Sequence, residues 1–137
     1  MLFALTKILS IIGVRTFFNR VTVWHEDRIP KAGPVIFVSN HPNTMMDPLV
    51  VGISCNRELH FFAKSPLFNH WLKRFFLSRL KLVPVYRKQD DPKLVRKNES
   101  TFDKGFRILE NNGAFLIFPE GVSTGDRILE KIKTGAA

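Results

Sequence analysis

Four short apolar runs, separated by helix-like segments, narrow the folds open to this chain more than any other feature. The runs cover residues 35–38, 59–63, 82–86 and 114–118, and their composition is typical of buried strands. Residues 49–54, 66–80 and 92–111 between them read as helices, the last ending at an Asn-Asn-Gly stop. This alternation predicts an α/β fold with a mostly parallel sheet flanked by helices. A shorter β-branched run at residues 21–24 is also strand-like.

The first twenty residues are expected to form an amphipathic helix outside the sheet. The stretch MLFALTKILSIIGVRTFF is interrupted by Lys7 and Arg15 and falls short of the roughly 20 apolar residues of a membrane span. We therefore expect residues 1–20 to lie at a membrane interface and residues 21–137 to form the main domain; packing of the helix on that domain is the alternative. One helix face would carry Leu2, Leu5, Leu9, Ile12 and Phe17.

Charge and cysteine content narrow the partners. The 137-residue chain has 21 basic and 12 acidic residues, a net charge of +9, and residues 64–104 alone carry eleven Lys or Arg against four Asp or Glu. Such a surface attracts lipid head groups, phosphorylated metabolites, coenzyme A or nucleic acid. No nucleic acid is expected, because the cations are not interleaved with aromatic residues in a recognised binding motif. The single Cys55 excludes an internal disulfide and a cysteine zinc cluster.

A polar loop follows the run at residues 35–38, at the kind of strand end where ligands gather in α/β sheets. It contains His41 and Asp47, a possible proton acceptor and a carboxylate that would fix its tautomer. Asp47 is also expected to cap a helix that begins with Pro48. Taken alone, the pair is more often an ordinary loop histidine beside a helix cap. A metal site is not favoured, because no third ligand lies nearby in the sequence.

Two more polar sites follow the other strands. Lys64 and Arg87 stand at successive strand ends and could bracket a phosphate, although two solvated surface cations are the alternative. Glu120 and Gly121 follow the last strand, where backbone N–H groups could bind an anion and the carboxylate could bind a polyol. An ordinary turn is the alternative there.

In this order, the three sites resemble the phospholipid/glycerol acyltransferase family, the PlsC-like domain. The matching segments are NHPNTMMDPL, FFAKSPLF through VPVYR, and FPEGVST. The closing KIKTGAA is similar to the family stretch after the third motif, so the resemblance covers most of residues 35–137. Since the chain stops where another helix would begin, we expect a domain that is truncated at its C-terminus.

The first motif favours one subgroup of that family. Five residues separate His41 from Asp47, where the common family motif has four. This form, with PVYR and FPEGVS, resembles the enzymes that acylate glycerol-3-phosphate or dihydroxyacetone phosphate. The third motif lacks the Arg that the family often carries there, which shifts the expected phosphate binding toward Lys64 and Arg87.

The resemblance implies a direct acyl transfer. His41 would deprotonate the acceptor hydroxyl while Asp47 holds it, and the alkoxide would attack the thioester of acyl-CoA or of acyl carrier protein. No cofactor, metal or acyl-enzyme is implied. Glu120 and Gly121 would shape the acceptor site, with support from Asn40, Asn43 and Ser123. The enzyme would act in phospholipid biosynthesis at the cytoplasmic face of an anionic membrane.

Two other functions remain open at this point. The acceptor could be lysophosphatidate or another lysophospholipid, because the motifs of these enzymes overlap. Alternatively, the basic charge and the N-terminal segment would suit a non-catalytic module that binds anionic membranes.

Overall fold

The computed structural model describes residues 2–132 apart from residues 45, 56, 89, 122, 124, 126, 127, 129 and 130. Its helices are α1 (Leu2–Phe17), α2 (Met46–Ser54), α3 (Trp71–Arg79) and α4 (Asn98–Glu110). Its strands are β1 (Val35–Val38), β2 (Leu59–Lys64), β3 (Leu82–Val85) and β4 (Ala114–Ile117). Three short 3-10 helices join them: η1 (Glu26–Arg28), η2 (Ser65–Phe68) and η3 (Pro92–Lys97).

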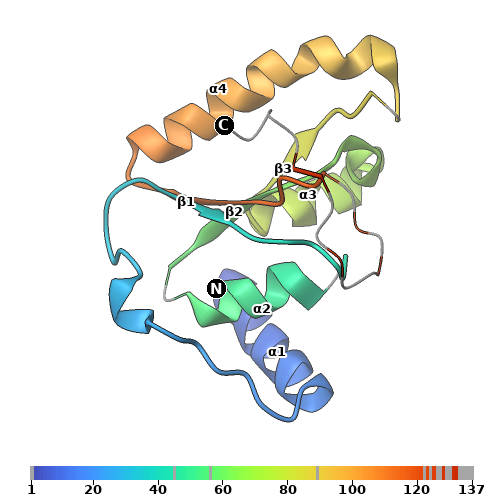
Figure 1. Cartoon of the computed structure of the whole chain (residues 1–137). Coiled ribbons are helices and arrows are strands. Elements are labelled where there is room, and N and C mark those ends of the chain that lie inside the picture. The colour runs from blue at the N-terminus through green and yellow to red at the C-terminus, as the bar shows by residue number, and fades with distance from the viewer. Residues whose placement is uncertain are drawn as a thin grey trace.

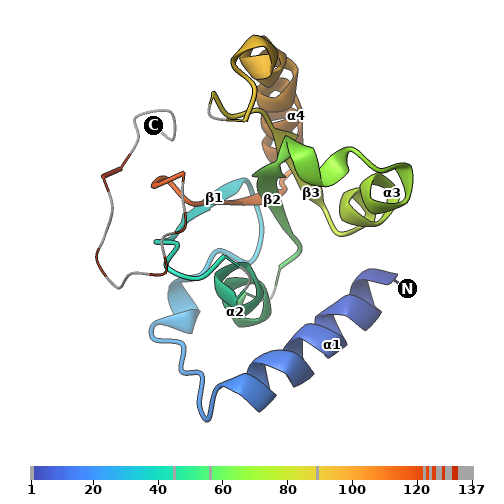
Figure 2. The ribbon, with the colours of Figure 1, turned by 90° about the vertical axis from the view of Figure 1, so that its right-hand side faces the viewer.

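The strands form one parallel sheet in the order β1-β4-β2-β3, which confirms the α/β prediction. Connections between parallel strands are almost always right-handed, so the direction of each step along the sheet decides which face its helix covers. The steps from β1 to β2 and from β2 to β3 run one way, and the step from β3 to β4 runs back. Accordingly α4 lies on one face and α2 on the other, with α3 beside the β3 edge (Figures 1 and 2).

The core lies between the sheet and α2. It is built from Cys55, Leu59, Ala114 and Leu116, with Phe37 packed against them. Burial raises the pKa of the Cys55 thiol, which suits a small apolar core residue rather than a nucleophile. The opposite face packs on α4, where the rings of Phe62 and Phe115 lie 4.5 Å apart and Gly105 leaves them room.

Three of the expected elements differ in the structure. Residues 21–24 form no strand; they are exposed, and without a neighbouring strand their backbone has no ladder partner. The helix expected over residues 66–80 is split into η2 and α3, because the ring Nδ1 of His70 accepts a hydrogen bond from the backbone N–H of Leu72 and starts a new helix. Residues 92–111 are likewise divided into η3 and α4.

The N-terminal segment forms the helix α1, which packs outside α2 and buries Val14 (Figure 2). The apolar residues expected on one face are exposed, namely Leu5, Leu9, Ile12 and Phe17, while the side chain of Leu2 lies outside the described set. Among the residues that the structure describes, no helix has the length and apolar character needed to cross a bilayer.

Gly113 closes α4 in a way that no larger residue can. The N–H groups of Asn112 and Gly113 donate to the carbonyl oxygens of Leu109 and Ile108, and Asn112 takes a left-handed φ of 58°. These two bonds form the Schellman motif that the Asn-Asn-Gly stop predicts. A Cβ on Gly113 would lie 2.5 Å from the Ile108 carbonyl oxygen, which the helix holds in place.

We therefore expect Gly113→Ala to lower the free energy of unfolding by about 1–3 kcal/mol. The matched control is Gly13→Ala, whose added Cβ meets nothing within 4 Å on an exposed part of α1. Because Ala favours a helix interior more than Gly, this control should be neutral or stabilising. Urea unfolding followed by circular dichroism measures both, and an unchanged midpoint for Gly113→Ala would contradict the assigned geometry.

Candidate active site

His41 and Asp47 meet in the loop that joins β1 to α2. The ring Nδ1 of His41 lies 3.1 Å from Oδ2 of Asp47, and the two side chains are only 14% and 20% exposed. A carboxylate on Nδ1 accepts the proton there, so it fixes the tautomer that leaves Nε2 as the basic nitrogen. The two residues are thus placed as an imidazole base and the group that orients it.

The helix cap belongs to Asn43 rather than to Asp47, which corrects the expectation from the sequence. The side-chain Oδ1 of Asn43 accepts a hydrogen bond from the N–H of Met46, and the Asn43 carbonyl accepts one from the N–H of Asp47. Asp47 is therefore the second residue of α2. From there its Oδ2 also accepts a hydrogen bond of 2.7 Å from the N–H of Asn43.

The loop after β4 holds His41 from the other side. Oε1 of Glu120 accepts a hydrogen bond of 3.1 Å from the backbone N–H of His41, and the Glu120 side chain is buried. The ring of Phe118 stacks on the His41 imidazole, with centroids 3.9 Å apart and an angle of 17°. These contacts arise because β1 and β4 are neighbours in register, with Val38 opposite Ile117, so the loops beyond them start side by side.

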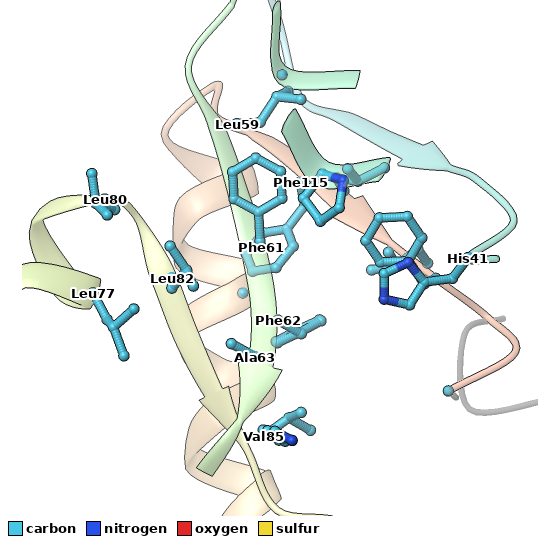
Figure 3. Close-up of a pocket in the computed structure, with 18 of the residues that line it drawn as sticks. His41, Leu59, Phe61, Phe62, Ala63, Leu77, Leu80, Leu82, Val85 and Phe115 are labelled. Atoms are coloured by element: carbon cyan, nitrogen blue, oxygen red, sulfur yellow. The ribbon is translucent and has the colours of Figure 1, made fainter. Parts of the chain in front are cut away.

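A cavity of about 1170 Å³ connects four other predicted site residues to His41. Lys64, Arg87, Gly121 and Ser123 all line it, together with apolar side chains from α2, α3, α4 and the four strands. His41 lies at one end of the lining residues and Leu77 at the other (Figure 3). The cavity is therefore a largely apolar chamber with a histidine at one end and cations along its wall.

The two predicted cations act on one carboxylate. Nε of Arg87 lies 2.7 Å from one Asp90 oxygen and the terminal NH2 lies 2.7 Å from the other. The hydrogen bond from Arg87, followed by the charges of Arg87 and Lys64, holds the pKa of the Asp90 carboxyl below its usual value. Asp90 thus already pairs with Arg87, one of the two cations at which a phosphate was expected.

The end of β3 that carries Arg87 is clamped by the start of α4. The side-chain amide of Asn98 accepts from the N–H of Tyr86 and donates to its carbonyl, and the hydroxyl of Thr101 donates to the carbonyl of Pro84. Both side chains supply hydrogen bonds that a neighbouring strand would otherwise make to this edge of the sheet. They hold the backbone next to Arg87 in one place.

The remaining histidines have local structural contacts. His60 lies with Nδ1 3.3 Å from the carbonyl of Ala114, and burial lowers its pKa, so it stays neutral. His70 begins α3, and His25 is exposed beside η1. In the part of the chain that the structure describes, no group of three or more His, Cys, Asp or Glu could hold a metal ion.

The structure thus brings together most of the predicted site and adds one contact that was not predicted. Asn43 and Glu120 contact the His41–Asp47 pair, while Asn40 is exposed and does not line the cavity. The stacking of Phe118 on His41 was not predicted. The sequence places Phe118 directly after the last strand, at a strand end like His41. Only the order of the strands shows that β4 lies next to β1, so that the two rings can meet.

One of three comparisons with known proteins finds a family. A family model described as Acyltransferase matches residues 20–137, which include all four strands and both loops around His41. Comparison with curated proteins and with solved structures gives no match.

Proposed function

Because the chain belongs to the acyltransferase family, we propose that it moves a fatty acyl group from acyl-CoA, or from acyl carrier protein, to a hydroxyl of glycerol-3-phosphate or dihydroxyacetone phosphate. The observation that carries this proposal is the partly buried His41–Asp47 pair beside a large apolar cavity that Lys64 and Arg87 also line. Family members transfer acyl groups in lipid biosynthesis and are often membrane-associated.

In the proposed reaction, Nε2 of His41 takes the proton of the acceptor hydroxyl as its oxygen attacks the thioester carbonyl. Asp47 accepts a hydrogen bond from Nδ1 and stabilises the imidazolium that forms. The tetrahedral intermediate then collapses, the carbon–sulfur bond breaks, and the proton on His41 goes to the leaving thiolate. The products are an ester and a free thiol, and no acyl-enzyme is needed.

The cavity suits the acyl chain. Its 1170 Å³ exceeds the roughly 300–1,000 Å³ of common small-molecule pockets, and its walls include Phe61, Phe62, Leu82 and Val85. A flexible hydrocarbon gains free energy from apolar surface removed from water, without needing directed hydrogen bonds. The chain would extend from His41 toward α3 (Figure 3).

The acceptor phosphate would bind at Lys64 and Arg87. There it would replace the Asp90 carboxylate on Arg87, and the existing carboxylate pair supports an anion at this guanidinium. A phosphate can accept two parallel hydrogen bonds from one guanidinium, and it carries more charge than a carboxylate. Gly121 and Ser123 line the same cavity and are proposed to contact the acceptor.

Glu120 has a positioning role in this proposal. Its carboxylate contacts the backbone of His41, so it keeps the base in place from the neighbouring strand end. Any direct contact of Glu120 with the acceptor remains a proposal, as do the supporting roles of Asn40 and Asn43.

The experiment that tests the function is thiol release from acyl-CoA by the purified chain. Glycerol-3-phosphate, dihydroxyacetone phosphate and lysophosphatidate are compared as acceptors at equal concentration, with acyl carrier protein as the alternative donor. We expect the small phosphates to be preferred. A strong preference for lysophosphatidate would reverse the choice of acceptor. Vesicle binding without any thiol release would favour a non-catalytic membrane module.

Replacing the cavity cations should weaken acceptor binding rather than the chemical step. We expect Arg87→Ala and Lys64→Ala each to raise the KM for the acceptor about tenfold, because each loses one charge-assisted contact to phosphate, with a smaller effect on kcat. Arg107→Ala, an exposed cation of α4 outside the cavity lining, is the matched control. Steady-state kinetics with varied acceptor concentration measure the KM. An unchanged KM in both variants would contradict phosphate binding at this position.

A further inference from the structure

The helix α3 presents a broad apolar surface to solvent. Trp71 is 75% exposed and Phe75 is 52% exposed, and their spacing of four residues puts them on one helix face. Leu72 and Phe76 continue this surface around the helix. Single exposed apolar residues are common, but four large ones on a nine-residue helix mark a contact surface.

The same helix carries only positive charge. Residues 59–88 contain seven Lys or Arg and no Asp or Glu. Three of these cations, Lys73, Arg74 and Arg79, belong to α3 and are exposed. The Arg79 guanidinium lies 5.4 Å from the centroid of the Phe75 ring, so charge and apolar area occupy one surface. This combination complements an anionic lipid bilayer, in which head groups bind the cations and the interface accepts Trp and Phe.

The position of α3 connects this surface with the cavity. Leu77 and Leu80, on its inner side and at its end, line the same chamber as His41. Lys7 and Ser10 of α1 line it as well, and α1 and α3 lie on the same side of the molecule (Figure 2). Both helices therefore line the cavity and also carry exposed apolar residues.

We propose that the surface formed by Trp71, Leu72, Arg74, Phe75 and Arg79 is a docking site for an anionic lipid bilayer, in addition to any contact made by α1. It would hold the Leu77 end of the cavity against the lipid, so that an acyl chain passes between bilayer and cavity without crossing water. That last clause rests on the proposed function, whereas the docking itself does not. A second copy of the chain fits less well, because two such helices would bring like charges together.

The fluorescence of Trp71 reports this contact directly. The chain has two Trp, so Trp24→Phe leaves Trp71 as the sole reporter. With vesicles of phosphatidylcholine and phosphatidylglycerol, we expect its emission to shift to the blue and to be quenched by brominated acyl chains. Trp71→Phe, which leaves the 82% exposed Trp24, is the matched reporter and should be quenched less. Vesicle cosedimentation with unchanged Trp71 emission would overturn the proposal.

Charge reversal tests the electrostatic part. We expect Arg74→Glu with Arg79→Glu to weaken vesicle binding tenfold or more at low salt, and the difference should shrink as salt is raised. Arg96→Glu with Arg107→Glu changes the net charge equally, but in η3 and α4, and should weaken vesicle binding less than threefold. Equal losses in the two double variants would overturn the proposal. It would also be overturned if the Arg74/Arg79 double variant had a lower molar mass than the wild-type chain in sedimentation, because the surface would then serve self-association.

Turnover separates this proposal from the proposed function. Without vesicles, the Arg74/Arg79 double variant should keep wild-type thiol release from a short-chain, water-soluble acyl-CoA, because neither residue belongs to the cavity. Loss of that turnover would overturn the assignment of these residues to docking alone. If the wild-type chain shows no turnover while brominated lipids in vesicles still quench Trp71, the proposed function is contradicted and the docking site is supported.

Discussion

His41→Ala is expected to reduce the rate of acyl transfer by about 10²–10⁴-fold, the usual contribution of a positioned general base. Without the imidazole, the acceptor hydroxyl keeps its proton and remains a weak nucleophile at neutral pH. The effect should fall on kcat, because the cations proposed to hold the acceptor, Lys64 and Arg87, remain in the cavity. Thiol release from acyl-CoA at saturating acceptor measures it.

The control separates chemistry from folding. The ring of His41 packs on Phe118, so its removal also leaves space in the site. His41→Gln fills part of that space without providing a base, and it should be as inactive as the Ala variant. His25→Asn changes an exposed histidine and keeps a residue that tolerates a φ of 58°. Acyl transfer above a tenth of the wild-type rate in a folded His41 variant would sink the mechanism.

Asp47→Asn should lower kcat on the order of 10²–10⁴-fold while leaving the fold nearly intact. Oδ2 of Asp47 contacts both the His41 ring and the Asn43 N–H, and an amide oxygen in its place can still accept the hydrogen bond from Asn43, so the turn persists. The neutral amide carries no negative charge, so it no longer stabilises the imidazolium that forms when His41 takes the proton. The KM of the acceptor should change little.

A second carboxylate in the chain provides the comparison. Oδ1 of Asp91 accepts a hydrogen bond from the N–H of Lys93 at the start of η3 and so acts as an ordinary cap. If Asp47 were only such a cap, Asp47→Asn and Asp91→Asn would cost similar stability and leave kcat alone. Thermal unfolding and kcat for both variants decide between these roles.

Local chemistry made much of the fold predictable. The four strands, the helix stop at Asn111-Asn112-Gly113 and the helix before residue 20 lie within a few residues of their expected places, because each depends on neighbours in the sequence. The errors are local as well. Residues 21–24 have strand-like composition but no strand beside them, and Asn43 rather than Asp47 caps α2.

The order of the strands was not predictable in this way. Hydrophobic periodicity describes which residues are buried, but it does not say which strand lies beside which. Only the arrangement β1-β4-β2-β3 puts the loop of His41 next to the loop of Glu120 and Phe118, residues almost eighty positions apart in the chain. The pairing of Arg87 with Asp90 and the clamp from Asn98 depend on side-chain geometry in the same way.

The sequence by itself determined the types of element, the polar residues at their ends and, through three motifs in order, the acyltransferase family. Those properties follow from local spacing and residue chemistry. The tertiary structure decided that His41 is held between Asp47 and Glu120, that the cations share its cavity, and that the apolar side chains of α3 face solvent. Each depends on contacts between distant segments, whose free energy is gained only once the sheet has closed around its core.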